Sequence, residues 1–201
     1  MSDHKPTLWL VAGPNGVGKT TYALKHIRAV SGSVHFVNLD EIARGLSPLD
    51  PEVARTAAAR VALERTAEMI EARASFTIET TLAGRTHLRT VEQARVHGLA
   101  VNLLFFTVRD VLICLARVAR RVSEGGHHVP EADVRRRFDR GLANFTDYVA
   151  AVDLWRVFAN NAAKPIVVAE GRRGCVGICG GDEGLPPELA ARVARLPPCQ
   201  E

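Results

Sequence analysis

Short apolar runs alternate with longer amphipathic stretches along the 201-residue chain. Runs of the length and composition of strands occur at 8–12, 34–40, 74–81, 100–108 and 165–170. Between them, helical patterns begin at about 19, 50, 110 and 131, and another helix follows the third strand. Strands that alternate with helices predict an α/β fold in three layers, with a parallel sheet of about five strands flanked by helices.

Local signals indicate where the helices begin and end. Asp50 and Pro51 predict a helix start, as N-cap and first helical residue, for a helix that runs to about residue 73. Gly98 is expected to end the helix that follows the third strand. In the helix predicted over 131–150, one face carries the core positions Val134, Phe138, Leu142, Phe145 and Val149.

The last part of the chain differs in composition. Residues 1–173 carry all the predicted strands, and we interpret them as one domain. Residues 174–201 are rich in glycine and proline, and we expect a loosely ordered tail with one short helix near 188–195.

Composition narrows the class of protein. Hydrophobic content of 47% and charged content of 24% are ordinary for a globular domain. No run approaches the roughly 18 apolar residues of a membrane span, and the N-terminus lacks the apolar core of a signal peptide. Four cysteines are too few for a disulfide framework, and Cys175 and Cys179 lack a second ligand pair for zinc. We therefore predict a reduced, cytoplasmic protein that does not contact membranes.

The segment after the first strand fits the phosphate-binding pattern G-x-x-x-x-G-K-[ST]. The expected ATP-binding loop comprises Gly13, Pro14, Asn15, Gly16, Val17, Gly18, Lys19, Thr20 and Thr21. Its backbone N–H groups would surround phosphate oxygens at a helix N-terminus. Lys19 would reach the β- and γ-phosphates, and Thr20 would give its hydroxyl to Mg²⁺.

Two acidic residues follow other predicted strands. Because the carboxyl ends of parallel strands meet at one edge of a sheet, Asp40 and Glu79 should face the same crevice as the loop. Asp40 is a candidate general base for an acceptor hydroxyl, and the alternative is a cap for the helix at 41–46. Glu79 is a candidate acceptor contact, and the alternative is a buried polar pair with Thr80 or Thr81. Asp110 lies beyond its strand and is expected to cap the next helix.

The formal net charge is +4, and many of the arginines lie between residues 109 and 140. Arg117 and Arg121 are four residues apart on one helix, where they can act together as a clamp. On the next helix Arg135 and Arg137 flank the apolar face, whereas Arg136 and Arg140 point to solvent. Between the two helices lies "EGGHHVP", so the whole segment has the form of an arginine-rich lid. Its His127 is a candidate acceptor contact, and the alternative is an ordinary residue at the tip of the lid.

Taken together, these motifs resemble the zeta toxin family of P-loop small-molecule kinases. The resemblance rests on "GPNGVGKTT", "VNLDEIARGLSP", "FTIETTLAG" and "RVARRVSEGGHHVPEADVRRRF". It implies ATP and Mg²⁺ as cofactors, Asp40 as the activator of a sugar hydroxyl, and Glu79 with Thr80 at the acceptor sugar. The lid arginines of the family match Arg121 and Arg137, with Arg117 as a third. Characterised members phosphorylate the 3′-hydroxyl of the N-acetylglucosamine unit of UDP-N-acetylglucosamine, and some are neutralised by an antitoxin.

The chain also departs from that family. It is shorter than the larger members, and Asn160-Asn161 stands where an aspartate-containing loop beside the base is expected. A nucleotide-sugar kinase is the leading hypothesis. The alternatives are a kinase of another small acceptor such as an antibiotic or metabolite, a nucleic-acid end kinase or ATPase, and a degenerate nucleotide-binding module. An aromatic content of 5% leaves few stacking platforms, so nucleic acid is a less favoured partner.

Overall fold

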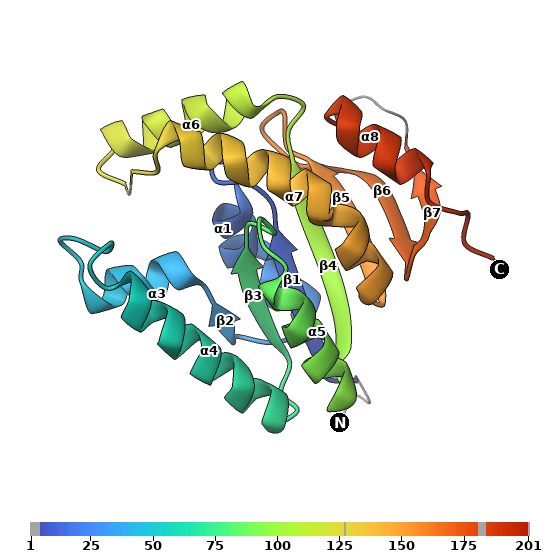
Figure 1. Ribbon diagram of the computed structural model, residues 1–201, viewed down its shortest axis with the longest axis horizontal. Helices are drawn as coiled ribbons and strands as arrows, with labels where there is room; N and C mark the ends of the chain where they lie inside the picture. Colours follow the sequence, from blue (N-terminus) through green and yellow to red (C-terminus); the bar gives the residue numbers. More distant parts are fainter. Residues whose placement is uncertain (1–4, 127, 181–183, 201) are drawn as a thin grey trace.

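A sheet of seven strands, in the order β2-β3-β1-β4-β5-β6-β7, organises the computed structural model (Figure 1). The structure describes residues 5–126, 128–180 and 184–200. The strands are β1 (Thr7–Ala12), β2 (Phe36–Val37), β3 (Phe76–Thr80), β4 (Ala100–Thr107), β5 (Leu154–Ala159), β6 (Ile166–Arg172) and β7 (Cys175–Cys179). The helices are α1 (Lys19–Tyr22), the π-helix η1 (Ala23–Ile27), α2 (Arg28–Ser31), α3 (Leu39–Leu46), α4 (Arg55–Glu71), α5 (Thr86–Val96), α6 (Val111–Ser123), α7 (Glu131–Ala151) and α8 (Pro187–Ala194).

The strands from β2 to β5 pair in parallel, which confirms the predicted α/β class. The prediction that residues 165–170 form the fifth parallel strand is wrong. The expected strand at 165–170 is β6, which pairs antiparallel with β5 and with β7. The true fifth parallel strand is β5, "LWRVFA", in which exposed Leu154 and Arg156 alternate with buried residues. Its apolar pattern is too short to distinguish a strand from the end of the preceding helix.

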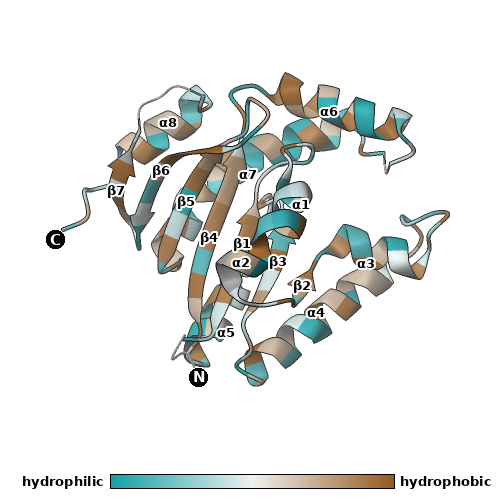
Figure 2. Cartoon of the chain, turned by 180° about the vertical axis from the view of Figure 1, so that it is seen from behind, coloured by the Kyte–Doolittle hydropathy of each residue, from teal (hydrophilic) through white to brown (hydrophobic). Residues whose placement is uncertain are grey.

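Helices lie on both faces of the sheet, as predicted. Figure 1 shows α5 and α7 crossing one face, and Figure 2 shows α1 and α2 against the other, with α3 and α4 beside the β2 edge. The predicted apolar stripe of α7 is buried against the sheet. Phe145 contacts Phe105 of β4 and Trp155 of β5, with ring centroids 5.2 and 5.7 Å apart. Burial of this stripe holds α7 in place and, with it, the arginines at its N-terminal end.

The region between β1 and β3 differs in detail from the prediction. Strand β2 covers only 36–37, and Asn38 caps α3 by accepting hydrogen bonds from the backbone N–H groups of Asp40 and Glu41. Asp50 accepts from the backbone N of Glu52, but the regular helix α4 begins later, at Arg55. Asp110 caps α6 as expected, accepting from the backbone N of Leu112 at 2.8 Å. Gly98 follows α5 with a φ of 86°, in the left-handed region that suits a helix end.

The expectation of a loosely ordered tail is wrong for the residues that the structure describes. Strand β7 adds to the sheet beside β6, and α8 packs against α7. Leu185, Leu189 and Val193 are buried. The glycines and prolines of this segment led to the prediction of weak order. These residues favour turns, and turns can connect regular elements such as β7 and α8.

Replacing Leu189 by Ala tests whether the tail belongs to the core. Leu189 is fully buried, so we expect a loss of about 2–4 kcal/mol in the free energy of unfolding, measured by urea denaturation. Leu49→Ala is the matched control, since Leu49 is fully exposed and its removal should cost less than about 0.5 kcal/mol. Equal effects of the two variants would show that α8 does not contribute to the cooperative fold.

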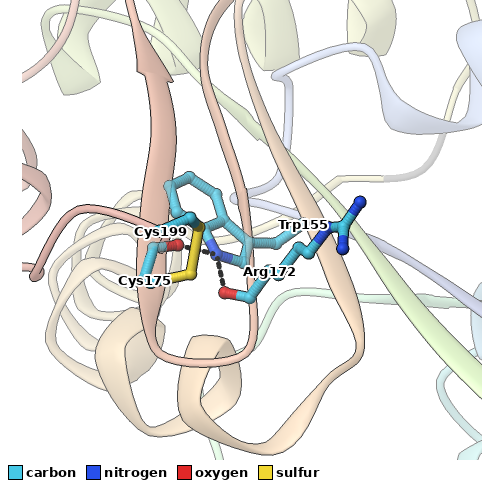
Figure 3. Close-up of a disulfide and its surroundings, with 4 residues drawn as sticks. All are labelled: Trp155, Arg172, Cys175 and Cys199. Carbon is cyan, nitrogen blue, oxygen red and sulfur yellow. Dashed lines mark hydrogen bonds between the residues drawn. A yellow bond between two sulfur atoms is a disulfide. The ribbon is translucent and has the colours of Figure 1, made fainter. Parts of the chain in front are cut away.

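The expectation that the cysteines are reduced is also wrong. Cys175 and Cys199 form a disulfide across 24 positions of sequence (Figure 3). Beside it, the indole N–H of Trp155 donates to the carbonyl oxygens of Arg172 and Cys175, at 2.9 and 3.2 Å. Residues 197–199 return alongside β7, where the backbone N of Val176 donates to Pro197 O and Cys199 N donates to Val176 O. Sequence spacing cannot reveal this return, so the cysteine count carries no argument about compartment.

Among the described residues, no helix is long and apolar enough to cross a membrane.

Candidate active site

The phosphate-binding loop connects β1 to α1, in the strand–loop–helix order that the motif requires. Gly13 has a φ of 138°, and a Cβ there would lie 2.2 Å from the carbonyl oxygen of Phe106. Gly18 has a φ of 96° and would place a Cβ 2.7 Å from the side chain of Asn160. Both positions therefore require glycine, the first for close packing on β4 and the second for the turn into α1. The backbone is shaped as an anion-binding loop at a helix N-terminus.

Lys19 lies inside this loop with only 6% of its side chain exposed. Its Nζ donates to Pro14 O at 3.0 Å and lies 3.7 Å from Glu79 Oε1. Burial lowers the pKa of Lys19, while Glu79 and Asp40 act in the opposite direction. A phosphate entering the loop would add negative charge beside this ammonium group and would favour its charged form.

Glu79 stands at the carboxyl end of β3, and the structure places it against the phosphate-binding loop. Both carboxylate oxygens lie 2.9 Å from Thr20 Oγ1, which donates to them, and Oε2 accepts from Asn38 Nδ2 at 2.9 Å. Burial raises the pKa of Glu79, and Lys19 and the hydrogen bond from Thr20 oppose that rise. The predicted alternative, a pair with Thr80 or Thr81, is not what forms. The strand order explains this, because β3 is the direct neighbour of β1.

Asp40 lies in the first turn of α3 with an exposed side chain. The capping role that competed with catalysis belongs to Asn38. The Asp40 carboxylate lines a cavity of about 450 Å³ that also contains Lys19 and Glu79. The crevice predicted from the strand ends therefore exists, and it brings Asp40, Glu79 and the loop together.

The far side of this cavity contains residues that the sequence analysis missed. Thr80 lines it as expected, and α4 and α5 contribute Arg55, Thr66, His87 and Thr90, with apolar wall residues Ala59, Ala62 and Leu63. Burial lowers the pKa of His87, which favours a neutral imidazole at neutral pH. Thr66 and Thr90 are buried residues of these helices, and no motif in the sequence marks them as part of a site.

The arginines of the lid differ in their burial and in the groups that they contact. Arg137 is 16% exposed, and its Nη1 donates to Asn15 Oδ1 of the loop at 3.0 Å. Arg117 donates to the carbonyl oxygen of Asn160, in the loop after β5, at 2.9 Å. Arg121 is exposed on α6, and its charge contributes to lowering the pKa of Lys19. Arg135 pairs with Glu131 at 2.7 Å and does not reach the loop.

The side chains of Asn160 and Asn161 make hydrogen bonds to backbone groups around the site. Asn160 Nδ2 donates to Val17 O of the phosphate-binding loop at 2.7 Å. Asn161 accepts from the backbone N of Arg109 and donates to Gly184 O. These amides therefore connect β5 to the loop and to the C-terminal region. His127, proposed as an acceptor contact, lies outside the described residues.

Residues 8–146 match a family model described as an AAA domain. A protein of uncharacterized function from Haemophilus influenzae is 32% identical over 126 residues, which cover 63% of this chain and 88% of that protein. Among solved structures, AvrRxo1-ORF1:-ORF2 with ATP has a TM-score of 0.67 at 19% identity, over 99% of this chain and 65% of that chain. This chain thus spans less than two thirds of that structure. The PezAT chromosomal toxin-antitoxin system of Streptococcus pneumoniae has a TM-score of 0.63 at 15% identity, over 84% of this chain and 72% of that chain. At these identities the two structures show a shared fold.

Proposed function

This chain belongs to the AAA domain family, and from that premise we propose that it is an ATP-dependent kinase of a small molecule that carries a hydroxyl group. The observation that carries the proposal is the shared cavity. Lys19 of the phosphate-binding loop and Glu79, which accepts from Thr20 of the loop, line the same cavity as the exposed carboxylate of Asp40. A phosphoryl donor site and an acidic acceptor site are thereby joined, as phosphoryl transfer requires.

On the donor side, the loop N–H groups and Lys19 would bind the β- and γ-phosphates of ATP. Arg137, held over the loop by Asn15, is placed to stabilise negative charge on the transferred group, and Arg121 is proposed to join it. Arg117 is proposed as a positioning residue, which holds the backbone of Asn160 beside the loop. These assignments give each predicted arginine a distinct role.

Mg²⁺ fits the donor side by the chemistry of its oxygen ligands. The Thr20 hydroxyl and the Glu79 carboxylate are hard oxygen donors in contact with each other, and Mg²⁺ is commonly held by one or two such groups together with phosphates. Among the described residues no group of three or more His, Cys, Asp or Glu could hold a metal alone, which favours a site completed by nucleotide. The ion would supply charge neutralisation of the phosphates. We therefore propose that Glu79 serves the metal side rather than the acceptor sugar.

On the acceptor side, Asp40 would accept the hydroxyl proton as the hydroxyl oxygen attacks the γ-phosphorus. The bond from the γ-phosphorus to the bridging oxygen breaks, and ADP leaves with that oxygen. Thr80 and the neutral imidazole of His87 would hydrogen-bond polar groups of the acceptor. The apolar wall of α4 would exclude water from the reacting groups.

A nucleotide sugar such as UDP-N-acetylglucosamine is the acceptor that we favour, through the resemblance to zeta toxins and the size of the cavity. An antibiotic or metabolite is the second candidate, and a nucleic-acid end is the third. The PezAT chromosomal toxin-antitoxin system also suggests a protein antitoxin as a partner for this chain.

Incubation with γ-labelled ATP and a panel of acceptors tests the function. The panel should contain nucleotide sugars, free sugars, aminoglycosides and RNA 5′ ends. We expect labelled product with a nucleotide sugar. Label released only as inorganic phosphate with every acceptor would contradict a kinase and indicate an ATPase.

Glu79→Gln tests the assignment of Glu79 to the metal side. Loss of the carboxylate should weaken activation by Mg²⁺ about 10- to 100-fold and leave the KM of the acceptor within about twofold. The measurement is initial rate against free Mg²⁺ at saturating acceptor. Glu68→Gln, at an exposed carboxylate on α4, is the control. A rise confined to the acceptor KM would return Glu79 to the acceptor sugar.

A further inference from the structure

Two cavities that share lining residues lie at the proposed acceptor site. The first is the cavity of about 450 Å³ that contains Asp40 and Lys19. The second, of about 500 Å³, lies between the start of α4 and the N-terminal end of α7, and its lining includes His128, Val129 and Pro130 of the lid. Arg55 and Arg137 line both cavities. A ligand longer than one sugar ring could therefore extend from Asp40 past Arg55 and under the lid.

The two shared arginines are held differently. Arg137 is bound to Asn15 and so belongs to the donor loop. Arg55 is the first residue of α4, on the opposite wall, and its side chain is 37% exposed. Glu52 Oε1 accepts from Arg55 Nη1 at 3.1 Å. A guanidinium has five N–H donors, so this ion pair leaves donors that can face the cavities.

The charge of the second cavity favours an anion. Its lining includes three arginines, Arg55, Arg136 and Arg137, and two carboxylates, Glu52 and Asp133. Asp133 is shared by Arg136 at 2.9 Å and Arg137 at 3.6 Å. Among the described residues, the lining therefore carries a net positive charge before His128 is counted. The planar fork of arginine suits a phosphate, which it can bind through two parallel hydrogen bonds.

We propose that Arg55 is the anion-binding residue of an acceptor subsite under the lid, and that it binds a phosphate or diphosphate group of the acceptor. This inference rests on the proposed function, since it concerns the same acceptor. The hydroxyl to be phosphorylated lies at Asp40, and the anionic part of the molecule lies at Arg55. Arg55 thereby determines specificity for a phosphorylated acceptor over its neutral counterpart.

Calorimetric titration tests this assignment on the full chain, with the donor loop filled by adenylyl imidodiphosphate and Mg²⁺. The probes are UDP-N-acetylglucosamine, inorganic pyrophosphate and neutral N-acetylglucosamine. For Arg55→Gln we expect about 10- to 100-fold weaker binding of both anionic probes, as for loss of a charged hydrogen-bonding partner, and unchanged binding of the neutral sugar. Arg55→Lys should retain part of the affinity, because it keeps the charge but not the fork.

Arg65→Gln is the matched control. Arg65 lies on the same helix, pairs with Glu68 at 2.9 Å as Arg55 pairs with Glu52, and lines neither cavity. Unchanged affinity for adenylyl imidodiphosphate shows that each variant is folded. Equal effects of Arg55→Gln and Arg65→Gln, or no effect of Arg55→Gln, would overturn the assignment.

The same experiments separate this inference from the proposed function. Transfer of label to neutral acceptors, with no binding of either anion to the nucleotide-filled protein, would remove the subsite and leave the kinase. Arg55-dependent anion binding with no transfer to any acceptor would support the subsite and remove the kinase.

Discussion

Asp40→Asn is expected to lower kcat by about 10²- to 10⁴-fold while ATP affinity stays within about twofold. The amide cannot accept the hydroxyl proton, yet it has the shape of the carboxylate. Asn38 already caps α3, so the variant should not disturb the helix that carries residue 40. The measurement is single-turnover transfer from γ-labelled ATP, with nucleotide binding followed separately by calorimetry.

Asp139→Asn is the control for this prediction. Asp139 is exposed on α7 and does not line the acceptor cavity. It should retain full activity. An Asp40→Asn variant with unchanged kcat would show that another group, or water, takes the proton.

Lys19→Met should lower transfer by about 10³-fold or more, because it removes the buried positive charge that faces the β- and γ-phosphates. Methionine keeps much of the side-chain volume, so packing within the loop is largely preserved. We expect weaker ATP binding as well, since Lys19 would contact the phosphates in the ground state. Initial rates and calorimetric ATP affinity together measure both effects.

Lys25→Met on η1 is the matched control, because Lys25 is exposed and lines neither of the two cavities at the site. It should leave rate and affinity unchanged. Wild-type turnover in Lys19→Met would place the ATP site elsewhere in the chain.

The positions of Asp40 and Glu79 after strands predicted their shared crevice but not their individual contacts. The rule that ligands bind at the carboxyl ends of parallel strands located both acids at one crevice. It did not distinguish their partners. The adjacency of β3 and β1 places Glu79 against Thr20, whereas α3 turns Asp40 toward the open cavity. Strand order is a property of the assembled sheet, so a single sequence does not reveal which acid touches which side of the site.

Arg117 and Arg137 show the same limit on the lid. Helical spacing correctly separated the buried stripe of α7 from its arginines. The partner that each arginine reaches depends on what lies opposite it: Arg137 donates to Asn15 of the loop, and Arg117 donates to the backbone of Asn160. Arg55 stands at a helix start without a motif, so the sequence does not mark it, whereas the structure places it in the lining of both cavities.

The α/β class, the phosphate-binding loop and the apolar face of α7 can be predicted from the sequence, because these features depend on neighbours within a few residues. Four other features emerge from the folded chain: the antiparallel extension by β6 and β7, the Cys175–Cys199 disulfide, the pairing of Glu79 with Thr20, and the place of Arg55. Each of these depends on contacts between residues far apart in the chain. Local periodicity does not encode such contacts, and they form when the sheet closes around its core.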